Sequence, residues 1–152
     1  KLPLDSTHFR KNCTLTNVSN KPRKPTPLRE EQRRLSTVMI VDDDRSTVSL
    51  LQMLLELDGF KIVTAGRGAD AIIAAQKSAP DLVMVDYHLA DMRGIEVITQ
   101  LRAMPSCANI PIIMASGMNV EEDALKAGAT QFLTKPFDPS ALTPLFNRLI
   151  GE

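Results

Sequence analysis

The stretch TVMIVDDD, residues 37–44, decides the fold, because an unbroken apolar run stops at three consecutive acids. A short, continuous apolar run of this kind is typical of a strand buried on both faces of a parallel sheet. A second apolar run, Leu82 to Val85, also stops at an acid, Asp86. Two buried strands that both end in acids predict an α/β fold with polar residues gathered at one edge of its sheet.

Outward from these two strands, the chain alternates between strand and helix patterns. Further strands are predicted at Phe60 to Ala65, Ile110 to Ala115 and Thr130 to Thr134. Helices are predicted around Leu51 to Leu55, over Gly68 to Ser78, Gly94 to Met104 and Val120 to Ala127, and around the stripe Leu142, Leu145, Phe146 and Leu149. Five β-α units in a row predict a doubly wound parallel sheet with helices on both faces.

The composition is that of a soluble globular protein: 43% of the 152 residues are hydrophobic and 24% are charged. No apolar run approaches the roughly 18 residues that span a bilayer, and the first residues lack the apolar core of a signal peptide. We therefore expect a cytoplasmic location. Cys13 and Cys107 have no metal-ligand spacing and are expected to be inert thiols.

A net charge of zero conceals two regions of opposite charge. Residues 1–35 hold nine Lys or Arg against three Asp or Glu, a net charge of +6, whereas residues 36–152 hold nine against fifteen, a net charge of −6. Pro22, Pro25 and Pro27 interrupt the basic region. We expect a basic flexible linker over 1–35 and one folded domain over 36–152. Because no aromatic residues alternate with the basic ones, neither nucleic acid nor a membrane is expected to bind directly.

Polar side chains follow four of the predicted strands. If the first and third strands are neighbours, Asp42, Asp43 and Asp86 converge on one spot, where three carboxylates repel one another unless a cation neutralises them. Hard oxygen ligands favour Mg²⁺ or Mn²⁺. Lys135, after the fifth strand, adds a positive charge, and Ser116, after the fourth, offers a hydroxyl to a phosphoryl oxygen. The set is suited to phosphoryl transfer onto a carboxylate.

Each of these residues also has a structural explanation when it is taken alone. The three acids at 42–44 could cap the helix that follows, and Asp44 is expected to do so. An Asp at a strand end is usually a turn residue, and a Lys-Pro pair is common. The functional interpretation depends on all four elements falling at the ends of the right strands in the right order.

Residues 36–152 resemble the receiver domain of response regulators and hybrid histidine kinases. The motifs that carry the resemblance are Val41-Asp42-Asp43, Val85-Asp86 followed by Met92, Gly94 and Glu96, Ala115-Ser116-Gly117, Lys126-Ala127-Gly128-Ala129 and Lys135-Pro136-Phe137. The resemblance implies a flavodoxin-like (βα)5 fold with the strand order 2-1-3-4-5. It also implies that the Lys135–Pro136 peptide bond is cis.

The resemblance further implies a role for each residue at the strand ends. Asp86 would accept a phosphoryl group from phosphohistidine. Asp43 and Asp86 would bind Mg²⁺ through their side chains and His88 through its backbone carbonyl, while Asp42 would act mainly through bound water. Lys135 would contact the phosphoryl group.

Four positions depart from the common pattern of the family or modify it. Ala90 replaces a frequent Pro, and Arg93 stands where an acid or Asn is common. Ser116 and Phe132 occupy the positions of the residue pair that switches on phosphorylation, but Phe132 has no hydroxyl to hydrogen-bond. The side chain of His88 is expected to line the site and to influence water access and the lifetime of the phosphoryl group.

The kind of protein from which this chain comes is predicted from the first residues of the linker. Lys1-Leu2-Pro3-Leu4 resembles the closing strand of a histidine-kinase ATP-binding domain. We therefore expect the C-terminal receiver of a hybrid sensor histidine kinase, which could be the cytoplasmic part of a membrane-bound protein. Its partners would be its own kinase core or another kinase, and a histidine phosphotransfer domain. The domain is itself a phosphoacceptor; only the parent kinase would be an ATP-dependent enzyme. The sequence does not predict an oligomeric state.

Several alternatives stay open at this point. The chain could be the receiver of a stand-alone response regulator, or a docking module that never takes a phosphoryl group. Flavin binding is disfavoured because acids, not phosphate-binding Ser, Thr or Gly residues, follow the first strand. A phosphatase of the haloacid-dehalogenase type would place two Asp residues two positions apart there, which Asp42 and Asp44 could mimic, but the chain lacks the length for it.

Overall fold

The computed structural model describes residues 34–151, which form a five-stranded parallel sheet in the order β2-β1-β3-β4-β5. The strands are β1 Thr37–Val41, β2 Lys61–Ala65, β3 Leu82–Asp86, β4 Ile112–Ser116 and β5 Gln131–Thr134. The helices are α1 Arg45–Leu57, α2 Gly68–Ser78, α3 Gly94–Arg102, α4 Glu121–Ala127 and α5 Leu142–Ile150. Two short 3-10 turns, η2 Pro105–Cys107 and η3 Pro139–Ala141, precede β4 and α5. The predicted fold and strand order are confirmed.

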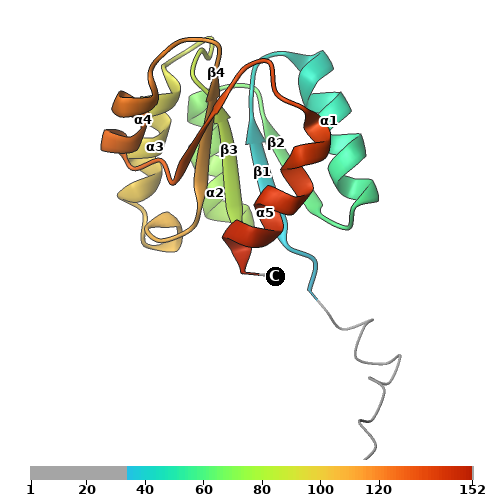
Figure 1. Cartoon of the computed structure of the whole chain (residues 1–152). Helices are drawn as coiled ribbons and strands as arrows, with labels where there is room; N and C mark the ends of the chain where they lie inside the picture. Colours follow the sequence, from blue (N-terminus) through green and yellow to red (C-terminus); the bar gives the residue numbers. More distant parts are fainter. Residues whose placement is uncertain (1–33, 152) are drawn as a thin grey trace, which may run out of the picture. The chain divides into compact units, whose positions relative to one another are not determined.

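Two layers of helices cover the two faces of the sheet (Figure 1). Side chains alternate along each strand, so that Met39 and Val41 face α2, α3 and α4, while Val38 and Ile40 face α1 and α5. All five residues of β1 are buried, which explains why its sequence is a continuous apolar run. Among residues 34–151, no helix is both long and apolar enough to cross a membrane.

Two boundaries differ from the prediction by two residues, in both cases because of proline, and the others that were given differ by one residue at most. The fourth strand begins at Ile112 instead of Ile110, since Pro111 has no N–H to add to the sheet and only its carbonyl accepts a bond, from the N–H of Val83 at 3.0 Å. The third helix ends at Arg102 instead of Met104, just before Pro105 opens a 3-10 turn.

The helix caps hold the acidic segment in place. Asp44 is the N-cap of α1, as predicted: its carboxylate accepts the N–H of Ser46 at 3.0 Å and the hydroxyl of Thr47 at 2.7 Å. Gly128 ends α4 with φ +114°, a left-handed conformation that glycine adopts at little cost. Because α1 starts directly behind residues 42–43, these acids stay at the strand end.

Most of the predicted linker, together with Cys13 and the Lys1-Leu2-Pro3-Leu4 segment, lies outside the described residues. Cys107 is buried and free, in agreement with an inert thiol. The Lys135–Pro136 peptide bond is cis, as the resemblance implied.

Candidate functional site at the carboxyl edge of the sheet

The strand register brings the predicted site residues to one edge of the sheet. Val41 lies beside Val85, so the segment after β1 runs next to Asp86 at the end of β3. Asp86 in turn pairs with Ala115 of β4, and Ser116 pairs with Thr134 of β5. The backbone N–H of Lys135 donates to the carbonyl of Ser116 at 2.9 Å, which places the end of β5 at the same edge.

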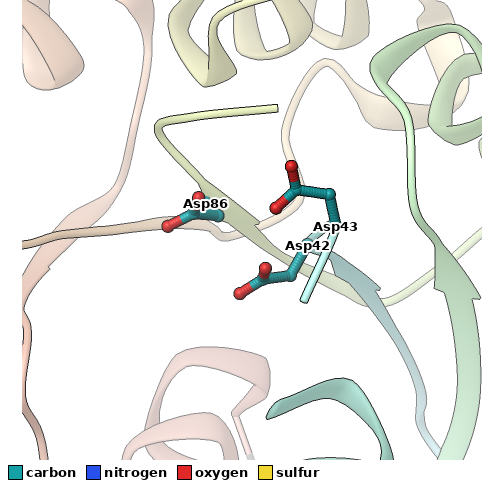
Figure 2. A group of neighbouring side chains, drawn as sticks. All are labelled: Asp42, Asp43 and Asp86. Atoms are coloured by element: carbon teal, nitrogen blue, oxygen red, sulfur yellow. The ribbon is translucent and has the colours of Figure 1, made fainter. Parts of the chain in front are cut away.

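Three carboxylates form a cluster at this edge. Figure 2 shows Asp86 at the end of its strand and Asp42 and Asp43 on the neighbouring segment. One oxygen from each lies within 4.8 Å of the others; Asp42 is buried, Asp86 half-buried and Asp43 exposed. Three hard oxygen donors this close, one of them open to solvent, fit Mg²⁺ or Mn²⁺. The acid cluster, here meaning Asp42, Asp43 and Asp86, is thus able to hold a divalent ion.

Lys135 reaches into the acid cluster from β5. Its Nζ donates to Asp86 Oδ1 at 2.7 Å and to Asp42 Oδ2 at 3.3 Å. Partial burial acts to lower the pKa of Lys135, but the hydrogen bond to Asp86 and the charges of Asp42 and Asp86 outweigh it and raise that pKa above its ordinary value. Lys135 therefore carries a full positive charge at neutral pH.

The carboxylate of Asp42 is held in an unfavourable environment. Burial raises its pKa and the charge of Asp86 acts in the same direction, against the lowering effects of Lys135 and of the Asp44 N–H, which donates to Asp42 Oδ1 at 2.9 Å. The net shift is upward, so the fold alone does not fully compensate the negative charge of Asp42. A bound cation would do so.

Two loops meet above Asp86. The N–H of His88 donates to Asp86 Oδ2 at 3.1 Å, and the N–H of Met118 donates to the Oγ of Ser116 at 3.1 Å. The side chains of His88 and Met118 then contact each other, with 3.0 Å between Nε2 and Sδ. The ring of Tyr87 packs edge-on against the His88 imidazole, with 4.8 Å between centroids. The His88–Met118 contact thus links the loops that follow β3 and β4.

Ser116 and Phe132 lie on adjacent strands. Ser116 is buried at the end of β4, whereas Phe132 is half-buried on β5, opposite Met114, and packs against the core beneath α2, α3 and α4. The structure therefore places both residues where the resemblance requires them, while their switching roles remain a prediction.

Two residues outside the predicted set, Met118 and Asp91, also organise this edge, and a third, Arg102, joins loops at the opposite edge of the sheet. Asp91, in the loop after β3, accepts the N–H groups of Gly68 and Ala69. The guanidinium of Arg102 donates to several backbone carbonyls, among them Gly128 at 2.8 Å and Ile110 at 2.6 Å. The partners of Met118 and Asp91 lie 30 and 23 positions away in the sequence, so no local pattern predicts these two contacts.

Comparison with known proteins places the chain in one family. The response regulator receiver domain profile matches residues 38–147. The alkaline phosphatase synthesis transcriptional regulatory protein PhoP of Bacillus subtilis is 39% identical over 105 residues, which are 67% of this chain and 43% of PhoP. The chain thus spans less than half the length of this relative.

Solved structures agree with the sequence comparison. The chemotaxis protein CheY4 of Vibrio cholerae is 28% identical with a TM-score of 0.73 over 76% of this chain and 99% of its own. The signal receiver domain of a signal transduction histidine kinase from Syntrophus aciditrophicus is 26% identical with a TM-score of 0.70, over 76% and 90% of the two chains. On the fold, the acid cluster and these matches, the chain belongs to the response regulator receiver domain family.

Proposed function

We propose that this domain takes a phosphoryl group from a phosphohistidine onto Asp86 and changes its binding partner as a result. The observation that carries the proposal is the position of Asp86 between Lys135, 2.7 Å from Oδ1, and the other two members of the acid cluster. An Asp nucleophile next to a fixed cation and a set of metal ligands is the arrangement that phosphoryl transfer requires.

The transfer is a single displacement at phosphorus. An oxygen of Asp86 attacks, the new O–P bond forms as the P–N bond breaks, and the electron pair of that bond stays on the donor imidazole. A divalent ion held by Asp43, Asp86 and the backbone carbonyl of His88, with Asp42 acting through water, would offset the charge on the phosphoryl oxygens. Lys135 compensates negative charge at the same place and orients the acceptor oxygen.

The acyl phosphate carries a charge of roughly −1.5 to −2, where the free carboxylate carried about −1. The hydroxyl oxygen of Ser116, which accepts the N–H of Met118 before phosphorylation, donates its proton to a phosphoryl oxygen afterwards, and Phe132 moves toward the space that Ser116 leaves. The surface formed by α4, β5 and α5 then favours a different partner, as a shift between two populations.

The relatives favour a response regulator as the parent protein. PhoP and the Rhizobium meliloti protein PhoB, 34% identical over 71% of this chain, are both transcriptional regulatory proteins. We therefore propose first that the parent protein is a stand-alone response regulator. The hybrid kinase expected from the tail stays as the second, supported by the kinase receiver of Syntrophus aciditrophicus. The neighbouring coding sequence decides: an output domain favours the first and a kinase core the second.

A phosphotransfer assay tests the proposed function. A histidine kinase labelled on its histidine is mixed with the full chain or with the Asp86→Asn variant, and label is followed on both proteins. Label is expected to move to the wild-type chain and not to the variant. If label stays on every kinase that is tried while the chain binds the kinase, the docking module that never takes a phosphoryl group is the better description.

A further inference from the structure

The first turn of α2 is capped by a residue from a distant loop. Arg67, the residue before the helix, is extended and its side chain makes no capping bond. Instead, the carboxylate of Asp91 accepts the N–H of Gly68 at 2.8 Å and the N–H of Ala69 at 3.0 Å, one with each oxygen. Asp91 lies in the segment between β3 and α3, five residues after Asp86. One side chain thus joins α2 to the phosphoacceptor loop, residues 87–93.

The phosphoacceptor loop is closed at its base. His88 and Arg93 form an isolated antiparallel bridge, and the N–H of Gly94 donates to the carbonyl of Tyr87 at 2.7 Å. A Cβ on Gly94 would collide with the backbone carbonyl of Asp86, which shows how closely the two ends of the loop approach. The base of the loop is therefore fixed by its own backbone, and the remaining freedom lies at its tip.

The tip of the loop rests on the start of α2. A Cβ on Gly68 would collide with the side chain of Met92, so α2 and the tip are in direct contact. The bonds from Ala69 and Gly68 lower the pKa of Asp91, which stays ionised next to the positive end of the helix dipole. The contact therefore joins a charged group to two backbone donors across a packed interface.

Two groups of the proposed metal site lie in this loop or directly before it. Asp86 precedes the loop and His88 belongs to it, and the N–H of His88 donates to Asp86 Oδ2 at 3.1 Å, which ties the two residues together. We propose that Asp91 is a positioning residue: by holding the loop tip against α2 it presets the His88 carbonyl and the Asp86 carboxylate for a divalent ion. This inference rests on the proposed function, because it requires that the acid cluster binds Mg²⁺.

Removing the anchor is expected to weaken Mg²⁺ binding. In Asp91→Ala the loop tip is free to move and must be ordered again when the ion binds, and groups that orient metal ligands typically contribute 10–100-fold to affinity. We expect an affinity about tenfold lower, at the low end of that range, because Asp91 acts through the backbone. Asp91→Asn can accept only one of the two N–H groups with its single carbonyl oxygen. Its Mg²⁺ affinity should therefore lie between those of the wild type and Asp91→Ala.

Tyr87 provides the measurement. It is the only tyrosine of the chain, there is no tryptophan, and it adjoins Asp86, so its fluorescence reports on the site. The full-length wild type, Asp91→Ala and Asp91→Asn are titrated with Mg²⁺, with the Mg²⁺-dependent shift of the thermal midpoint as a second readout. Asp81→Ala is the matched control: Asp81 accepts the N–H of Thr37 at 2.7 Å, a similar tie at the opposite edge of the sheet.

The outcomes separate a positioning role from a purely structural one. Loss of their backbone hydrogen bonds should lower the thermal midpoint of both Ala variants, but only Asp91→Ala should lose Mg²⁺ affinity, with partial recovery in Asp91→Asn. If Asp91→Ala binds Mg²⁺ as tightly as the wild type does, the inference is wrong and the proposed function is untouched. If the wild type itself binds no Mg²⁺, both are overturned.

Discussion

Asp42 is the residue at which function and stability conflict. Burial raises the pKa of its carboxyl group, so the folded state disfavours the charged form. A carboxyl group with a raised pKa contributes stability that is fully present below its ordinary value of 3.8 and is lost as the pH rises through the raised value. At neutral pH, without metal, ionised Asp42 therefore destabilises the fold.

We predict that Asp42→Asn raises the thermal midpoint at pH 7 in a metal-free buffer, because the amide has no charge to bury. The gain should shrink as the pH falls through the raised pKa of Asp42 and should be gone below 3.8, where the wild-type carboxyl group is protonated in the folded and the unfolded state. Thermal unfolding of both proteins from pH 3 to 8 measures the difference. The exposed Asp43→Asn is the control and should change less. A wild type that is more stable than Asp42→Asn at pH 7 would contradict the pKa direction.

Met118 defines the second prediction at this scale. Its thioether sulfur contacts Nε2 of the His88 ring, and about half of Met118 remains exposed. Such sulfur–ring contacts contribute about 1 kcal/mol, which corresponds to about fivefold in a rate. We expect Met118→Ala and His88→Ala each to speed loss of the phosphoryl group about fivefold, because water gains access to it.

The two changes should not add, because either one opens the same contact. The decay of the phosphorylated mass over time measures the effect in the two single variants and in the double variant. Ile73→Ala removes an equally exposed apolar side chain from α2 and should leave the decay unchanged. A double variant that decays at the product of the two single effects would show that the residues act separately.

The residues of the site were predictable only in part. The acids at 42–43 and 86 can be recognised in the sequence because they directly follow apolar runs. That they converge could be predicted only if β1 and β3 were neighbours, and the family resemblance implied that strand order. Met118 and Asp91 carry no such signal. Met118 contacts His88 although the two are 30 positions apart in the sequence, and Asp91 contacts Gly68 across 23 positions. Only the packed fold brings these pairs together.

At the scale of one element, α1 buries one side and leaves a second apolar side open. Leu51 and Leu55 are buried against the sheet, whereas Leu50, Met53 and Leu57 are exposed, at the spacing i, i+3, i+7. A groove of about 410 Å³ starts at Leu50 and continues along the segment after β5 to Lys135. The exposed side of α1 therefore leads to Lys135, which contacts Asp86, the proposed phosphoacceptor to which a donor protein would have to bring its histidine.

We predict that Met53→Glu slows phosphotransfer from a phosphohistidine protein, by about tenfold if one buried contact worth about 1.4 kcal/mol is lost. Transfer from a small-molecule phosphodonor should be unchanged, because no docking is involved. Ile73→Glu, with a similar exposure on the other face of the sheet, is the control. Equal slowing with both donors would mean that the substitution damages the site and not the docking surface.

The elements themselves were largely predictable, and the exceptions have local causes. β1 and β3 are readable because burial on both faces leaves room only for apolar residues, and α5 because one stripe of it is buried. The predicted start of β4 lay two residues too early, and the predicted end of α3 lay two residues too late. The apolar pattern ran on across Pro111 and up to Pro105, whereas the hydrogen bonds of the strand and the helix stop at these prolines.

At the scale of the whole molecule, the sheet separates two apolar cores. Phe146 of α5 is fully buried in the core beneath α1 and α5, and its ring packs edge-on against Phe60 with 5.9 Å between centroids. Aromatic rings bury more apolar surface than any other side chains, so this contact is a main support of that layer.

We predict that Phe146→Ala costs about 3–5 kcal/mol of unfolding free energy, because the cavity it leaves cannot close. The total unfolding free energy of domains of this size is about 5–15 kcal/mol, so the variant should be close to unfolding at 37 °C. Urea denaturation measures the loss. Leu125→Ala, on the exposed surface of α4, should stay within about 0.5 kcal/mol of the wild type. A small loss in Phe146→Ala would mean that the layer repacks.

The whole-molecule fold followed from the sequence because five β-α units in a row allow few arrangements. The parent protein did not follow, because the tail that was used to predict it lies outside the described residues. The relative PhoP is a transcriptional regulatory protein, while at least one solved receiver of similar fold belongs to a histidine kinase. The phosphoacceptor chemistry is independent of that choice.

The most direct test of that chemistry is the intact mass of the chain after incubation with acetyl phosphate, with and without Mg²⁺, beside Asp86→Asn. The account predicts a gain of one phosphoryl group that requires Mg²⁺ and is lost in the variant. A gain that persists in Asp86→Asn, or that does not depend on a divalent ion, would contradict the assignment of Asp86 and of the acid cluster.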